Sequence, residues 1–245
     1  QLPMILPDGS WLHGINDASV RIGLRLSKDE TIVRTPFEVR HMGSKYPIFS
    51  FDFIGAKKGI LPTSYDYLRL EGRMQYRLNL PPVGYSRLML EGGKIFGKVP
   101  YLLLKLHEGN GTYFYDRYAF SCMNFYEFSS DAWISFFYEH HFNGFLLGRV
   151  PLLKKLNWRE VFVFKGVYGT LSARNDGSLP NTKAVMLFPV GMSSVEHPYL
   201  ETGFGIENIF RLLRVDCIWR LTHHRAVPGL SIPTFTVNFS LNLKF

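Results

Sequence analysis

The residues whose types could support chemistry are eight histidines and the carboxylates near them. Glu139 and His141 lie two positions apart in an alternating segment, so their side chains share one face, and the adjacent His140 lies on the opposite face. One carboxylate and one imidazole are too few ligands for a zinc site. We therefore predict a polar contact at Glu139 and His141, with no metal and no other cofactor.

Covalent catalysis would require a nucleophilic side chain beside a base. Ser135 and Ser240 lie on polar faces, but neither has a histidine at the neighbouring positions of its own face. The sequence contains no Gly-x-Ser-x-Gly motif and no P-loop, and the glycines of residues 203–208 lie in a strand pattern that no helix follows. We therefore predict no catalytic residue, and a hydrolase stays a further alternative.

Arginines form a larger pattern than the histidines do. The formal net charge is +8, but no lysine-rich run, zinc-finger spacing or basic helix accompanies it, so we do not expect nucleic acid as a partner. Arginines and carboxylates instead recur at alternate positions of several segments. The predicted charge network consists of Arg69, Glu71, Arg73, Arg77, Arg214, Asp216 and Arg220. The same charged face is predicted to include Arg21, Arg25, Arg34, Arg40, Glu38, Glu139, Glu201 and Glu207.

The elements that must position these charges have a period of two residues. From Leu68 to Leu80, every even position is apolar or glycine, and every odd position is charged or polar. This alternation is typical of a β-strand with two different faces. Similar patterns predict about eleven strands, at residues 17–28, 31–41, 47–54, 65–80, 86–99, 119–128, 132–144, 157–171, 199–208, 213–224 and 234–245.

Two places depart from regular alternation. Within residues 86–99 the apolar phase changes by one after Gly92 and Gly93, which predicts a β-bulge. Residues 172–197 contain an Asn-Asp-Gly turn signal and two prolines, and we interpret them as a surface loop.

Strand length separates a soluble β-sandwich from a membrane barrel. Sandwich strands typically span about five or six residues, whereas a tilted strand needs about 9–11 residues to cross a bilayer. The clean runs here are longer than sandwich strands, and their apolar faces are large and aromatic. In lipid every backbone polar group must pair within the sheet, which requires closure. The pattern therefore favours an all-β transmembrane antiparallel barrel with a charged interior over a sandwich.

The end of the chain supports the barrel interpretation. Residues 234–245 alternate without error and finish on phenylalanine, similar to the terminal signal of bacterial outer-membrane barrels. An exposed last strand can be recognised by strand pairing, as an assembly machinery would require. The predicted signal residues are Phe239, Leu241, Leu243 and Phe245.

Three tracts resemble one known family. They are EGNGTYFYDRYAFSCMNFYEFSSDAW, EHHFNGFLLGRVPLLKKLNWREV and GFGIENIFRLLRVDCIWRLT, within the part of the chain from residue 107 to the end. They resemble the barrel region of large Bacteroidota outer-membrane proteins that carry a carboxypeptidase-regulatory-like N-terminal domain. The resemblance implies an outer-membrane location, an unassigned activity, and a barrel built from more sequence than this chain contains. We accordingly expect residues 1–245 to be one barrel domain, the C-terminal part of a longer protein.

Strand parity gives an expected orientation. If the last strand ends in the periplasm, residues 172–197 lie outside the cell, and residues 98–106, 148–158 and 209–215 lie on the periplasmic side. These three segments mix leucines with lysine or arginine, which suits a membrane interface, and packing beneath the barrel is the alternative. The predicted interface residues are Pro100, Leu102, Leu103, Pro151, Leu152, Leu153, Lys154, Lys155, Arg211 and Leu212.

The function predicted from these features is non-enzymatic. We expect a structural or partner-binding subunit of a bacterial envelope assembly, located in the outer membrane. Its expected partners are outer-membrane lipids, the barrel-assembly machinery and other outer-membrane or periplasmic proteins. The alternative is a channel whose arginine-rich interior favours anionic solutes.

Overall fold

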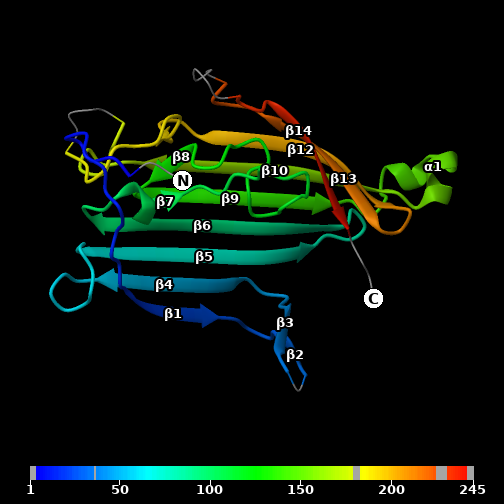
Figure 1. The fold of residues 1–245 in the computed structure, drawn as a ribbon. Coiled ribbons are helices and arrows are strands. Elements are labelled where there is room, and N and C mark those ends of the chain that lie inside the picture. Colours follow the sequence, from blue (N-terminus) through cyan, green and yellow to red (C-terminus); the bar gives the residue numbers. More distant parts are fainter. Residues whose placement is uncertain (1–3, 36, 179–182, 225–230, 242–245) are drawn as a thin grey trace.

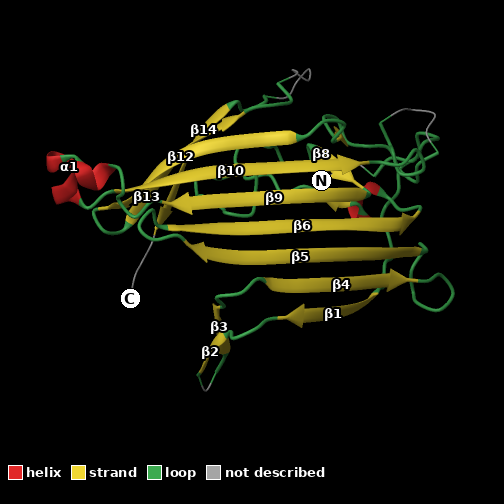
Figure 2. Ribbon diagram, turned by 180° about the vertical axis from the view of Figure 1, so that it is seen from behind, coloured by secondary structure: helices red, strands yellow, loops and turns green. Residues whose placement is uncertain are grey.

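The computed structural model describes residues 4–35, 37–178, 183–224 and 231–241. Most of the chain forms one antiparallel sheet of nine strands in the order β1-β4-β5-β6-β9-β10-β12-β13-β14 (Figures 1 and 2). The strands are β1 (Val20–Leu26), β4 (Ile48–Ala56), β5 (Tyr67–Asn79), β6 (Tyr85–Gly97), β9 (Ala132–His141), β10 (Arg159–Thr170), β12 (Tyr199–Ile209), β13 (Leu213–Arg220) and β14 (Phe235–Leu241). Within the described residues β1 and β14 are the two edges of this sheet and do not pair with each other.

Smaller elements connect the long strands. A hairpin of β2 (Thr31–Arg34) and β3 (Val39–Gly43) stands apart from the main sheet, and β7 (Lys105–Leu106), β8 (Phe128–Ser130) and β11 (Ser193–Ser194) form a three-stranded sheet. The helical elements are η1 (Tyr101–Leu103), η2 (Leu147–Arg149) and α1 (Pro151–Leu156), and α1 projects beyond one end of the sheet (Figure 1). None of the helices in the described ranges has the length and apolar character needed to cross a membrane.

The two faces of the main sheet reverse the usual distribution of polarity. One face carries large exposed hydrophobic side chains on nearly every strand, among them Ile22, Phe53, Leu68, Phe204 and Trp219. The other face carries charged side chains that are almost fully buried, namely Glu139, Lys165, Glu201, Arg214, Asp216 and Arg220. We call the first the outer face and the second the inner face.

The inner face is buried because other parts of the same chain cover it. Phe120, Met123 and Phe128 form a buried cluster with inner-face residues of β6, β9, β10 and β12. A second cluster joins Val99, Tyr101 and Leu104 to Met186 and Met192. In Figure 1 the segment between β7 and β8 runs across this face of the strands. Residues 107–127, which we call the covering segment, therefore fill the space that the sheet partly encloses.

The expected all-β antiparallel architecture is confirmed, with differences in the strand list. The main sheet holds nine strands rather than eleven, because residues 31–41 form the separate β2–β3 hairpin and residues 119–128 are mostly turns. The predicted positions 34, 38 and 40 therefore do not belong to the charged face of the main sheet. Residues 119–128 look strand-like because the covering segment is apolar where it packs on the inner face.

The predicted bulge at Gly92 and Gly93 is wrong. Both glycines pair in an unbroken register, Gly93 with Glu71 on one side and with Trp133 on the other. The apolar phase changes because the inner face itself becomes apolar towards Ile95, which packs in the second cluster. A side chain on Gly93 would also overlap Trp133 and the Leu70 carbonyl oxygen, which explains the glycine.

The segment at 172–197 is less superficial than predicted. Asn175 is buried and accepts a hydrogen bond from the Val99 amide, and Met186, Met192 and Val195 are buried as well. Residues 172–197 therefore contain turn-forming residues and still pack partly against the inner face.

The prediction that the three leucine–basic segments lie at one end of the sheet is wrong, because one of them lies at the opposite end from the other two. β6 ends where β9 begins, since Lys94 pairs with Ala132, whereas β9 ends where β10 begins, at residues 141 and 161. Residues 98–106 therefore lie at the opposite end of the sheet from residues 148–158 and 209–212. Residues 119–128 do not form a membrane-length strand. The predicted strand list therefore contained one extra strand, which placed residues 98–106 at the same end as the other two segments.

Candidate functional site

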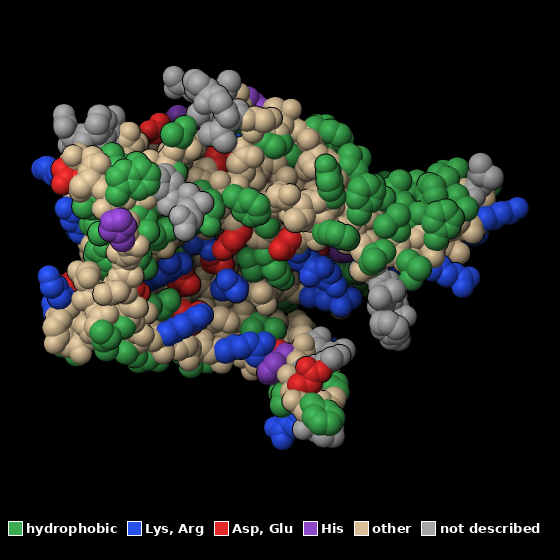
Figure 3. All heavy atoms as spheres, viewed as in Figure 1, with side chains coloured by type: hydrophobic (Ala, Val, Ile, Leu, Met, Phe, Trp, Pro, Cys, Tyr) green, Lys and Arg blue, Asp and Glu red, His purple; other side chains and the backbone are tan. Residues whose placement is uncertain are grey.

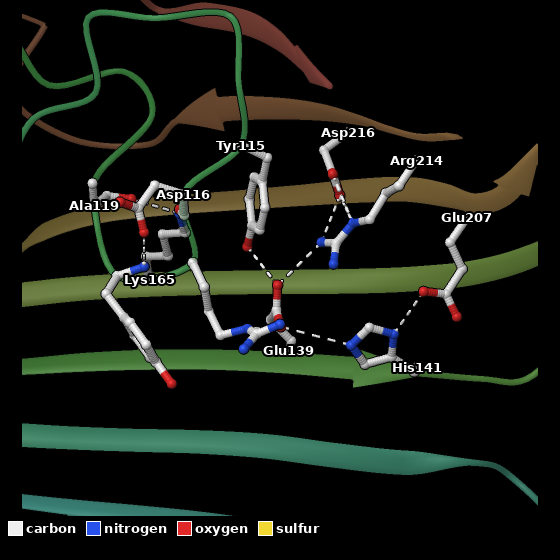
Figure 4. A network of polar contacts seen from close by, with 11 residues as sticks. Tyr115, Asp116, Ala119, Glu139, His141, Lys165, Glu207, Arg214 and Asp216 are labelled. Carbon is white, nitrogen blue, oxygen red and sulfur yellow. Dashed lines mark hydrogen bonds and ion pairs between the residues drawn. The ribbon is translucent and has the colours of Figure 1, made fainter. Parts of the chain in front are cut away.

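The centre of the polar interior is the carboxylate of Glu139 on β9 (Figure 4). It accepts hydrogen bonds from the Tyr115 hydroxyl at 2.7 Å and from Arg117 Nε at 2.6 Å, both in the covering segment. Arg214 Nη2 on β13 donates a third bond at 3.1 Å, and His141 Nε2 lies 3.6 Å away. Glu139 thus joins the covering segment to β13.

Two further acid–base pairs surround this carboxylate. The guanidinium of Arg214 donates from Nε and Nη2 to both oxygens of Asp216, at 2.8 to 3.0 Å. His141 Nδ1 lies 3.1 Å from Glu207 Oε2 on β12. These charges are buried but paired, which is the condition under which buried charges are tolerated.

The covering segment is also held through its backbone. Lys165 Nζ on β10 donates to the carbonyl oxygens of Asp116 and Ala119, at 2.8 and 2.5 Å. Glu201 on β12 accepts the backbone amides of Ser121 and Cys122, at 2.8 and 2.7 Å. Lys165 therefore donates only to carbonyl oxygens of the covering segment, and Glu201 accepts from its amides. Each strand residue is complementary in charge to the backbone groups that it holds.

Arg220 fixes the far end of the covering segment. Its Nη2 lies 2.6 Å from Glu127 Oε1, and its Nη1 donates to the Cys122 carbonyl oxygen at 3.1 Å. The same guanidinium lies over the ring of Tyr199, 4.8 Å from its centroid. All of these groups are buried or nearly so, so the segment and strand β13 form one packed unit.

The other half of the sheet, from β1 to β6, carries ion pairs with a partly or largely exposed member, except Lys105–Glu91, in which both side chains are buried. Arg73 Nη2 lies 2.6 Å from Glu91 Oε2, and Lys105 Nζ lies 2.8 Å from the other oxygen of Glu91. Arg69 pairs with Glu71 on its own strand, and at the edge Arg21 pairs with Asp52 at 2.8 Å. Arg69 and Glu71 are partly exposed, and Arg21 is largely exposed.

Two arginines of this half have no carboxylate partner in the part of the chain that the structure describes. Arg77 on β5 and Arg87 on β6 are directly opposite each other in the strand register. Both guanidinium groups lie near the ring of Tyr85, at 4.3 and 5.3 Å from its centroid. Tyr85 in turn stacks on His141, with ring centroids 4.5 Å apart.

Two cavities adjoin these arginines. One of about 470 Å³ is lined by five arginines, including Arg77 and Arg87, and by Glu207. The other, of about 960 Å³, shares Arg77, Arg87 and Arg117 and extends to the β2–β3 hairpin. In Figure 3 basic and acidic side chains gather in the hollow of the inner face. These cavities are the space in the described structure best suited to a small charged ligand.

Burial changes the acid–base properties of the segments that cover the inner face. It raises the pKa of the Tyr115 phenol well above its ordinary value, so Tyr115 stays a hydrogen-bond donor to Glu139. It lowers the pKa of His107 to about 3, because a charged imidazole would lose its hydration. Burial likewise raises the pKa of the Cys122 thiol to about 12. These directions suit structural contacts, since none creates an activated base or nucleophile near neutral pH.

The described residues contain no cluster of three or more His, Cys, Asp and Glu side chains that could hold a metal ion. Glu139 and His141 do share a face, but the groups bonded to Glu139 are Arg117, Arg214 and the Tyr115 hydroxyl, and His141 contacts Glu207. Cations around a carboxylate neutralise it, so this arrangement supports an ion-pair network.

The predicted charge network divides into two groups in the structure. Arg214, Asp216 and Arg220 join the buried interior, whereas Arg69, Glu71, Arg73 and Arg77 lie in the more open half. Of the predicted terminal signal, Phe239 and Leu241 are exposed on β14, and Leu243 and Phe245 lie outside the described residues.

The predicted interface residues also have different environments. Pro100 is buried, and Leu102 and Leu103 pack against the second apolar cluster, so this segment is internal. Pro151, Lys154 and Lys155 are exposed on α1, Leu153 is half-buried, and the side chain of Leu152 is outside the described residues. Arg211 and Leu212 are exposed in the β12–β13 turn.

The residues that sequence reasoning missed belong mainly to the covering segment. Tyr115, Arg117 and Glu127 come from a tract that looked like part of a strand or its approach, so no contact with Glu139 or Arg220 was expected. Lys165 had a usable signal, since it is the one charge inside the strand tract VFVFKGVYG. A lone charge in such a tract indicates a specific buried partner.

Comparison with known protein families identifies a family to which the chain is similar. The sequence model of a family described as "Family of unknown function (DUF5686) C-terminal domain" matches residues 14–173. The match begins earlier and ends earlier than the tract, from residue 107 onward, in which the resemblance was seen. No curated protein matches the chain.

Proposed function

The chain belongs to the DUF5686 family through its C-terminal domain, and we propose that it forms part of the wall and the internal plug of an outer-membrane β-barrel. The family itself has no established function. The role that we propose is structural: to present a membrane-embedded surface to partner proteins of the cell envelope. The edge at β1 would be joined by further strands in the complete barrel, whereas Phe239 on the β14 edge already exchanges backbone hydrogen bonds with Tyr113 and Tyr115 of the covering segment.

The observation that carries this proposal is the reversed polarity of the main sheet. Exposed contiguous apolar surfaces of this extent are rare in water, whereas barrel walls direct apolar residues to lipid and polar residues inwards. The length of the strands agrees, since β5 and β6 span 13 residues each and β10 spans 12. A tilted strand needs about 9–11 residues to cross the bilayer.

The filled interior favours a structural role over transport. Glu139, Glu201 and Lys165 tie the covering segment to three strands, so opening a wide path here would break several buried contacts. The channel alternative is supported by a different observation, the cavities lined by Arg77 and Arg87 in the open half. An anion-selective pore would use this half of the interior.

Reconstitution separates these possibilities. The purified chain, or the longest natural protein that contains it, is inserted into liposomes and washed with alkaline carbonate, and then studied in planar bilayers. The proposal predicts that the protein stays with the vesicles and shows no stable conductance. Large anion-selective steps would contradict the structural role and support the channel, and release by carbonate would contradict membrane insertion itself.

A further inference from the structure

We propose that the arginine-lined cavity beside Tyr85 is a binding site for a phosphate-type oxyanion. The cavity has a volume of about 470 Å³, which is ample for a phosphate group with ordered water or with part of a larger molecule. It lies on the inner face, at the end of the sheet where the β5–β6 turn and α1 are found. This inference requires the fold but not the membrane location.

Two arginines lie directly opposite each other beside the cavity. Arg77 and Arg87 face each other across adjacent strands, a placement in which like charges destabilise a sheet. No carboxylate among the described residues forms an ion pair with either. An anion bound between them would convert this repulsion into two attractive contacts.

Positive charge is also in excess around the same cavity. Its lining includes Arg117 and Arg214, which Glu139 and Asp216 already neutralise. Arg159 on β10 also lines it and has no ion pair in the described part of the chain, so Arg77, Arg87 and Arg159 oppose the single carboxylate of Glu207. The local excess corresponds to the charge of a phosphate dianion.

The guanidinium groups around the cavity are suited to phosphate, and aromatic rings restrict their positions. Guanidinium groups bind phosphate through paired, parallel N–H donors, which a lysine ammonium does not provide. The rings of Tyr85 and His141 stack with an angle of 11° between their planes, and Arg77 lies against the Tyr85 ring. This stack limits the positions open to Arg77, so the site is partly organised before the anion binds.

The site is tested by binding measurements on the purified full chain in a neutral detergent at constant ionic strength. Two probes, inorganic phosphate and short-chain phosphatidic acid, are titrated near pH 7.5 and followed by calorimetry and by the thermal unfolding midpoint. Phosphatidylcholine and sodium chloride serve as the uncharged-headgroup and salt controls. Binding of phosphate indicates a soluble ligand, and binding of phosphatidic acid alone indicates a lipid headgroup.

The variants make the assignment specific. The double substitution R77Q with R87Q should weaken binding of the active probe at least tenfold and abolish its effect on the unfolding midpoint, while the ligand-free midpoint stays equal or rises. The double substitution to lysine should retain only part of the affinity. R73Q is the matched control, because Arg73 lies on the same face of β5 but is paired with Glu91, and it should change affinity less than twofold.

Two results would overturn the proposal. One is the absence of saturable binding for both probes, with midpoint shifts no larger than those in sodium chloride. The other is equal weakening by R73Q and by the Arg77–Arg87 double variant, which would indicate general electrostatic attraction. Retained folding of each variant is checked by its β-sheet circular dichroism, so a loss of binding cannot arise from a loss of structure.

Discussion

The two halves of the main sheet use arginine in different ways. In the half from β9 to β13, Arg214 and Arg220 are buried, and each forms a close ion pair. In the half from β1 to β6, all of β1 is exposed on both sides, and Arg21 and Arg73 pair at partly or largely exposed positions. The covering segment is hydrogen-bonded to strands of the first half, and its apolar residues also pack against Met89 on β6.

This difference shows that the same alternating pattern can lead to two energetic situations. Removing the partner of a buried paired charge leaves an uncompensated charge in a low-dielectric region. A paired charge that water reaches contributes little. The covered half is therefore expected to be the rigid part, and the open half the part available for ligands or partners.

The largest loss of stability is expected when the central carboxylate of the covered half is removed. Glu139→Gln should lower the free energy of unfolding by about 3 kcal/mol or more, because Arg117 and Arg214 lose a shared buried partner. Glu71→Gln, the matched change in the open half, should cost about 1 kcal/mol or less. Denaturant unfolding in detergent, followed by tryptophan fluorescence, measures both. Equal losses would remove the distinction between the halves.

A smaller effect is expected where a carboxylate holds the backbone of the covering segment. Glu201→Gln should cost about 2 kcal/mol, the usual range for hydrogen bonds to a charged group. Because Glu201 accepts the Cys122 amide, the same change should speed maleimide labelling of the buried Cys122 thiol. Labelling of Cys217, which is on β13, serves as the internal control. An unchanged Cys122 rate would show that the segment is held by its apolar contacts alone.

Acidification should weaken the covered half through His107. The folded-state pKa is about 3 and the unfolded value is near 6.5, so the unfolded chain binds more protons between these values. The contribution of His107 to stability is therefore complete above about pH 6.5, and it falls by about 1–2 kcal/mol by pH 5. Unfolding midpoints of the wild type and of His107→Gln, measured between pH 7.5 and 5, test this. The variant should lose less stability on acidification, and parallel curves would contradict the role of His107.

The smallest effect is expected at the free edge of the open half. Arg21→Gln removes a pair with Asp52 in which the arginine is largely exposed, so the free energy of unfolding should change less than in any of the other variants. Repeating the wild-type measurement at high salt should have a similarly small effect. A loss as large as that of Glu201→Gln would mean that this edge is shielded from water in solution.

Local alternation was enough to predict the main strands, because a two-residue period fixes which side chains share a face. It also predicted that Arg214, Asp216 and Arg220 share a charged face. It could not show that the covering segment is not a strand, since Phe120 and Met123 are apolar for packing reasons that depend on distant strands. Nor could it predict contacts such as Arg117 with Glu139, which join residues from different elements. The strand parity failed for the same reason.

We propose that the exposed hydrophobic face of the sheet contacts lipid. Measurements along β5 test this contact most directly. Single spin labels are placed at successive positions from 68 to 77 in the reconstituted protein, and their collisions with oxygen and with a water-soluble nickel complex are measured. If this face contacts lipid, the collision rates should alternate with a period of two residues, with even positions such as Leu68 and Leu70 accessible to oxygen and shielded from nickel. Equal nickel access at even and odd positions would contradict it.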